Sequence, residues 1–137
     1  MGTFPKRERK MPATAQADLV KRGTVLFHHP YKVYYALLPR HGATPACAMV
    51  ISVPKRNFKR AVDRNRIKRQ VREAFRNNNT LLKSELNKKC GRIQMLCVYL
   101  PHEHAPTSLL FHKMASLLAR LAQCVSQSDT LATFSVD

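Results

Sequence analysis

The chain is poor in acidic residues. Its 137 residues include 8 Asp and Glu against 24 Lys and Arg, which gives a formal net charge of +16. The acids are scattered singly, with no D-x-D or D-x-x-E pair, whereas two-metal nuclease chemistry needs clustered carboxylates. The sequence therefore argues against a nuclease site carried by the protein, and we assign no catalytic residue.

Motifs that bind metals or form disulfides are also missing. The histidine clusters, His28-His29 and His102/His104, flank prolines and are typical of loops rather than of an acid–base or zinc site. No C-x-x-C pair or zinc spacing occurs among the four cysteines, which are Cys47, Cys90, Cys97 and Cys124. We therefore expect no metal bound by the protein alone and a reducing, cytoplasmic location.

Long hydrophobic runs are absent as well. No stretch of about 18 apolar residues occurs, and residues 1–10 lack the apolar run of a signal peptide, so we expect no contact with a membrane. Hydrophobic residues still make up 45% of the chain, enough for a packed core. We predict one domain over residues 1–137, with a loose basic arm (1–11) and a frayed tail (127–137).

The most informative stretch is residues 55–77, which is densely basic. Ile67, Val71, Ala74 and Phe75 recur at the spacing of a helix with one buried face, and neither Gly nor Pro occurs between residues 60 and 77. The opposite face then gathers cations. The candidate polyanion-binding residues are Lys55, Arg56, Lys59, Arg60, Arg64, Asn65, Arg66, Lys68, Arg69, Arg72 and Arg76.

Without a bound anion this cationic face lowers the stability of the helix, because like charges four residues apart repel each other. Only Asp63 and Glu73 oppose the cations, so a polyanion is expected to supply the missing negative charge. Two alternatives to polyanion binding remain: the basic face is merely solvated, or the helix lies on a membrane surface. The small and β-branched residues of the apolar stripe suit packing on a sheet better than insertion into lipid.

Periodicity along the chain predicts an α+β fold. We expect one four-stranded sheet with helices packed against it in a two-layer sandwich, in the order α-β-β-β-α-(α)-β-α. The predicted helices are 12–22, 60–77, 80–89 and 108–126, and the predicted strands are 24–28, 31–38, 46–53 and 93–100.

Several details can be tested against a structure. The strand 46–53 is almost wholly apolar, as expected for a central strand. Thr80 is the expected cap of the short second helix of the crossover. In the flanking helices, Leu19, Val20 and Leu109 are expected to point inward, and Phe27 and Phe58 to be packing residues.

The run VPKRNFKRAVDRNRIKRQVREAFR resembles the signature of the bacterial ribonuclease P protein subunit. That family carries a strand, a basic loop and then a helix with an Arg-Asn-Arg core, which corresponds here to Arg64-Asn65-Arg66. Ile67-Lys68-Arg69 follows directly, and then Arg72-Glu73-Ala74-Phe75. Weaker similarity, such as Phe4-x-Lys6-x-Glu8-Arg9, extends over most of the chain.

The resemblance implies a sandwich with a left-handed β-α-β crossover. It implies a monomeric protein that pairs one-to-one with a large catalytic RNA to remove the 5′ leader from precursor tRNA. That RNA would hold the Mg²⁺ ions and perform the cleavage. The Arg-Asn-Arg helix and the preceding loop would contact the catalytic RNA, and a cleft between sheet and helices would receive the leader.

The leader cleft departs from the family pattern in one respect. The first helix of the family often carries aromatic residues facing the cleft, but the matching positions here hold Val20 and Gln16. Tyr34, with Lys32 beside it, is therefore the better candidate for stacking on a leader base. The alternative for Tyr34 is a residue at the rim of the core.

Two other functions share the basic composition. A structural RNA-binding protein, such as a ribosomal protein, would have the same charge but no role in tRNA processing. A DNA-binding module would need a recognition helix, usually in a dimer, and residues 46–54 before the basic helix form a strand rather than a partner helix.

Overall fold

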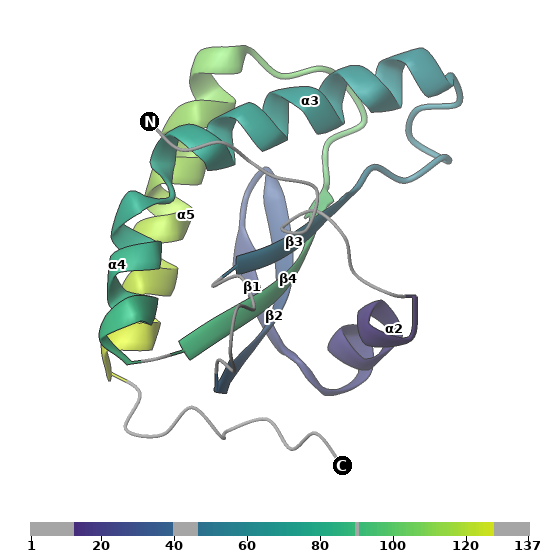
Figure 1. Ribbon diagram of the computed structural model, residues 1–137. Coiled ribbons are helices and arrows are strands. Elements are labelled where there is room, and N and C mark those ends of the chain that lie inside the picture. Colours follow the sequence, from purple (N-terminus) through teal and green to yellow (C-terminus); the bar gives the residue numbers. More distant parts are fainter. Residues whose placement is uncertain (1–12, 40–46, 90, 128–137) are drawn as a thin grey trace.

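The predicted α+β order is confirmed by a computed structural model, which describes residues 13–39, 47–89 and 91–127 (Figure 1). The predicted arm (1–11) lies outside the described residues, as does the tail beyond residue 127. The elements are α2 (Ala13–Arg22), β1 (Thr24–His28), β2 (Tyr31–Pro39), β3 (Cys47–Ser52), α3 (Ala61–Asn78), α4 (Thr80–Lys88), β4 (Gly91–Tyr99) and α5 (Thr107–Gln127).

The four strands form one mixed sheet in the order β1-β2-β4-β3. β1 pairs with β2, and β2 with β4, in antiparallel fashion, whereas β3 and β4 are parallel. Parallel neighbours need a crossover connection, and α3 and α4 provide it. The handedness of this crossover stays a prediction.

The prediction that β3 is a central strand was wrong, because β3 forms an edge of the sheet. Both of its faces are nevertheless covered, as its apolar run indicates. Cys47 and Met49 belong to the large core on one face, and Ala48 belongs to a smaller cluster on the other. An apolar run therefore indicates that both faces of a strand are buried. It does not indicate whether the strand lies at the centre or at the edge of the sheet.

The sheet has one fully covered face and one partly covered face. α3, α4 and α5 lie on the first, and α2 lies alone on the second (Figure 1). The predicted apolar stripe of α3 is confirmed, since all four of its side chains are fully buried. Tyr31 ties the layers together, because its hydroxyl donates a hydrogen bond to the carbonyl oxygen of Leu110 on α5 at 3.0 Å.

α2 covers only the middle of its sheet face. Leu19 is buried against Ala36, Ala48 and Leu96, whereas Val20 is 50% exposed, so the prediction that Val20 points inward was wrong. A lone helix on a sheet buries a narrow stripe, and residue 20 is turned about 100° away from Leu19. Gly23 ends the helix where a Cβ atom would lie 2.6 Å from the carbonyl oxygen of Leu19.

Two helix details also differ from expectation. Leu109 is 39% exposed rather than inward, because it precedes the buried stripe of α5 that begins at Leu110. Asn79, rather than Thr80, occupies the N-cap position of α4, and its side chain makes no capping hydrogen bond.

Candidate nucleic-acid interface

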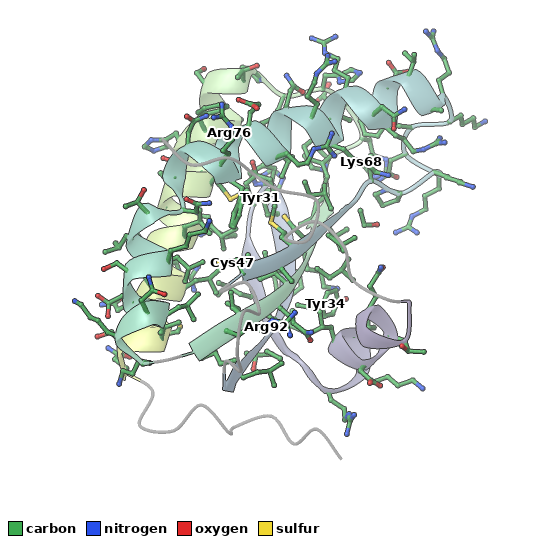
Figure 2. The ribbon with its side chains drawn as sticks, viewed as in Figure 1. Tyr31, Tyr34, Cys47, Lys68, Arg76 and Arg92 are labelled. Atoms are coloured by element: carbon green, nitrogen blue, oxygen red, sulfur yellow. The ribbon has the colours of Figure 1, made fainter. Side chains whose placement is uncertain are left out.

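The cationic face of α3 lies opposite its buried stripe, as Figure 2 shows for Lys68 and Arg76. Asn65, Arg66 and Arg69 are exposed, and the side chains of Lys68, Arg72 and Arg76 are partly exposed. Within the described residues, no salt bridge joins Arg66, Lys68 or Arg69 to a carboxylate. Most of the predicted site residues on α3 are therefore available to an external polyanion.

The loop before α3 is held in a defined shape. The backbone N–H groups of Asn57 and Phe58 donate to the carbonyl oxygen of Pro54, at 3.1 and 3.3 Å. Phe58 is only 8% exposed, and its ring centroid lies 6.0 Å from that of Tyr99 and 5.3 Å from that of His104. The expectation that Phe58 is a packing residue is confirmed.

This anchoring turns the basic side chains of the loop outward. Lys55, Arg56, Lys59 and Arg60 are all exposed around the buried Phe58. A loop fixed at both its backbone and its one large apolar side chain presents its cations with little loss of conformational entropy on binding.

Arg64 differs from the other predicted site residues. Its Nη1 atom donates to the carbonyl oxygens of Phe58 at 2.8 Å and Lys59 at 2.9 Å, so the side chain folds back onto the loop. Position 64 lies near the edge of the buried stripe on the helical wheel, which explains why Arg64 is half-buried. Arg64 therefore positions the loop, whatever it also binds.

The first turn of α3 carries the negative charge that a helix N-terminus favours. Asp63 lies 3.7 Å from Nε of Arg60 and 3.4 Å from Nε2 of His104. Because His104 belongs to the segment between β4 and α5, this contact joins the start of α3 to the connection that leads into α5.

The last turn of α3 carries an internal pair. Nη2 of Arg76 lies 2.6 Å from Oε1 of Glu73, and this hydrogen bond lowers the pKa of the exposed Glu73 carboxyl. Part of the charge of Arg76 is therefore neutralised within the helix, unlike that of Arg66 or Arg69.

A second candidate surface lies on the sheet face that α2 leaves open. The ammonium of Lys32 lies 5.1 Å from the ring centroids of both Phe27 and Tyr34, within the range of cation–π attraction. Lys32 and Tyr34 therefore lie together, as the sequence analysis expected, and Tyr34 is partly buried beside α2 (Figure 2).

Phe27 is a further residue of this surface, and the sequence did not predict it there. It is 63% exposed, so the expectation that Phe27 is a packing residue was wrong. Phe27 pairs with Lys32 across the β1–β2 ladder and therefore points to the same face of the sheet. The alternation of side chains along β1 places Phe27 on the same face as Val25. It cannot show that α2 leaves this part of the face uncovered.

Strand register connects this surface with the basic loop. Phe27 pairs with Lys32, Lys32 with Val98, and Val98 with Ser52, so one row of side chains crosses all four strands. Three strand spacings make this row about 14 Å long. The row ends at Ser52 on β3, and the basic loop begins three residues later at Lys55, so the two candidate surfaces are linked through this edge of the sheet.

Arg92 is a further cation on the same sheet face as Tyr34 (Figure 2). It pairs with Leu38 in the β2–β4 ladder, and its Nε atom has no hydrogen-bond partner. Burial lowers the pKa of its guanidinium. No helical or loop pattern in the sequence marked this residue.

The described residues offer neither a metal site nor a membrane-spanning helix. Among residues 13–39, 47–89 and 91–127, no three His, Cys, Asp or Glu side chains gather closely enough to hold a metal ion. No helix in these ranges combines the length and the apolar character needed to cross a bilayer.

Comparison with known proteins agrees with this geometry. The chain is 43% identical over 67 residues to the ribonuclease P protein component of Porphyromonas gingivalis, which covers 49% of this chain and 48% of the relative. It is 52% identical over 46 residues to that of Pseudoalteromonas atlantica, covering 34% of this chain and 38% of the relative. The matched segment thus spans about half or less of each relative.

Solved structures show the same fold. The RNase P protein of Staphylococcus aureus superposes with a TM-score of 0.60 at 19% identity, over 85% of this chain and 95% of that one. The protein from Thermotoga maritima gives a TM-score of 0.60 at 21% identity, over 82% and 96% of the two chains. The family model described as Ribonuclease P matches residues 4–122. Because the family model covers most of the chain, including the basic loop and the cationic helix, this chain belongs to the ribonuclease P protein family.

Proposed function

We propose that this protein is the protein subunit of ribonuclease P. It binds the catalytic RNA and the 5′ leader of precursor tRNA, and it promotes the endonucleolytic removal of the leader in the cytoplasm. One copy pairs with one RNA. The observation that supports this most directly is that the basic loop leads from the row of side chains on the open sheet face, which ends at Ser52, to the cationic face of α3.

The two candidate surfaces suit different parts of an RNA substrate. The exposed cations of α3 and of the loop suit the backbone of a folded RNA, because base edges in an A-form major groove are closed to side chains. The open sheet face, with Phe27, Lys32 and Tyr34, suits a single strand, whose bases stack on aromatic rings while its phosphates meet cations.

In this proposal the protein positions RNA and the RNA performs the chemistry. The carboxylates of the described residues are dispersed, and Asp63 and Glu73 are engaged with neighbouring side chains. Mg²⁺ would therefore be held mainly by the RNA subunit. The protein would neutralise phosphates close to it, which favours the folded RNA, and would hold the leader in line for cleavage.

Reconstitution tests the proposal. The protein is mixed with the ribonuclease P RNA from its own source at low Mg²⁺, and 5′ leader removal from precursor tRNA is measured, with each component alone as a control. We expect efficient cleavage only when both are present, and a loss of stimulation in Arg66→Ala. Tight RNA binding without stimulation would instead indicate a structural RNA-binding protein.

A further inference from the structure

The connection between β4 and α5 is fixed at both of its ends. At its start, the backbone N–H of Leu100 donates to the carbonyl oxygen of Pro30 at 2.9 Å. The hydroxyl of Tyr99, a residue that is only 1% exposed, donates to the carbonyl oxygen of Glu103 at 2.8 Å. Towards its end, Ala105 packs against the main hydrophobic core. The connection therefore has a defined position relative to the sheet.

The same connection runs along one flank of α3. Nε2 of His104 lies 3.4 Å from Oδ1 of Asp63 in the first turn of α3. Further along the helix, Nε2 of Gln70 donates to Oγ1 of Thr107 at 3.0 Å. Asp63 and Gln70 are seven residues apart, which places them on the same side of a helix, about two turns from each other. Two polar contacts thus fix α3 beside the connection.

His104 also contacts the basic loop that precedes α3. Its ring centroid lies 5.3 Å from that of Phe58, and the two ring planes meet at 53°. These values are typical of an attractive aromatic pair. Phe58 is the buried side chain that anchors the loop. One histidine therefore touches both the anchor of the basic loop and the first turn of the helix that follows it.

The contact with Asp63 does not require a charged imidazole. A carboxylate only accepts hydrogen bonds, so Nε2 of His104 carries the hydrogen atom in this contact. One neutral tautomer of histidine has this hydrogen atom, and so has the imidazolium. A side chain that presents an N–H group at the place of Nε2 can therefore replace His104 in this contact.

We propose that His104 is a positioning residue for RNA binding, because it holds the basic loop and the first turn of α3 in place on the sheet. A loop that is ordered before it binds loses less conformational entropy on binding, so His104 raises RNA affinity without touching a phosphate. The cations that it positions are exposed: Lys55, Arg56, Lys59 and Arg60. This role rests on the proposed function, in which these cations bind the catalytic RNA.

RNA affinity tests the proposal, with the full chain and the ribonuclease P RNA from its own source. His104→Ala removes both contacts and should weaken binding about tenfold. His104→Gln keeps an N–H donor near the place of Nε2 and should stay within about threefold of native. His102→Ala removes an exposed imidazole from the same connection and should bind as the native chain does. Native affinity in His104→Ala would overturn the proposal.

A double-mutant cycle separates positioning from direct contact with RNA. Because positioning acts partly through Asp63, His104→Ala should weaken binding only about threefold in an Asp63→Ala background, against about tenfold in the native chain. The carboxylate of Asp63 is absent from both chains of the second pair, so its own repulsion of RNA cancels. An equal loss in both backgrounds would refute positioning and show that His104 contacts RNA itself.

Hydrogen exchange of the free protein gives a second readout, which needs no RNA. The backbone N–H groups of Asn57 and Phe58 bond to the carbonyl oxygen of Pro54. They should exchange about tenfold faster in His104→Ala, because the loop opens more often, and at the native rate in His102→Ala. Unchanged exchange in His104→Ala would refute the role of His104.

The two proposals fail in different ways. A native chain that does not stimulate leader cleavage would refute the proposed function. A native chain that stimulates cleavage, with the native RNA affinity and the native loop exchange both kept in His104→Ala, would refute the positioning role alone.

Discussion

Arg64 holds Phe58 by its backbone: Nη1 of Arg64 lies 2.8 Å from the carbonyl oxygen of Phe58, and the Phe58 ring is buried. A side chain from the first turns of α3 therefore fixes the loop that precedes the helix. Arg64 and Arg66 therefore differ in what they contact, although both belong to the Arg-Asn-Arg motif: Arg64 binds the backbone of the loop. Arg66 is exposed and makes no ion pair within the described residues.

Exchanging each arginine for lysine should separate these roles. Arg64→Lys keeps the charge but loses the planar guanidinium that reaches two carbonyl oxygens, so RNA affinity should fall about tenfold, close to Arg64→Ala. Arg66→Lys should stay within about threefold of native if it meets a phosphate as a point charge. Filter binding at one salt concentration gives the comparison. Native affinity in Arg64→Lys would contradict a positioning role.

Phe27 should contribute to leader binding. Phe27→Ala removes an exposed ring beside Lys32 and should weaken binding of precursor tRNA by about 1–3 kcal/mol, the usual contribution of stacking on one base. The holoenzyme affinity for substrate with and without a leader is the measurement. Leu81→Ala, which removes another exposed apolar side chain on the opposite layer, is the control. An equal loss for leaderless tRNA would count against stacking.

His28 should make the fold sensitive to acid. Burial, Arg120 and Lys113 lower the pKa of His28, and Nη1 of Arg120 lies 3.1 Å from its Nδ1. The unfolded chain then binds a proton at a higher pH than the folded chain. The contribution of His28 to stability is therefore fully present above about pH 6.5 and declines as the pH falls below it.

Urea unfolding at several pH values between about 7 and 5 measures this contribution. The free energy of unfolding should fall more steeply with acid in the native chain than in His28→Gln, which cannot titrate. Identical slopes in the native chain and His28→Gln would refute the role of His28.

Tyr31 should stabilise the contact between sheet and helix. Tyr31→Phe removes the hydroxyl that donates to the Leu110 carbonyl oxygen and should lower the free energy of unfolding by about 1 kcal/mol. Tyr34→Phe, on the open face of the same strand, should change stability little. Equal losses in both variants would show that the buried hydrogen bond contributes no more than a surface hydroxyl.

The candidate site was only partly visible in the sequence. The cationic face of α3 could be predicted because its residues lie within five helical turns, and Lys32 and Tyr34 because alternation places them on one face of a strand. Phe27 and Arg92 could not, because their roles depend on strands and a helix distant in sequence. The place of His104 beside Phe58 and Asp63 likewise depends on contacts between segments that are distant in sequence.

The sequence alone determined the order of elements, the buried stripe of α3 and the charge opposite that stripe. These properties follow from local backbone periodicity, which each segment carries in its own side chains. Tertiary structure alone decided that β3 is an edge strand, that Val20 and Phe27 are exposed, and that Arg64 turns back to Phe58. Those outcomes depend on which surfaces α2 and the crossover helices cover, and that coverage is set by long-range packing of the whole chain.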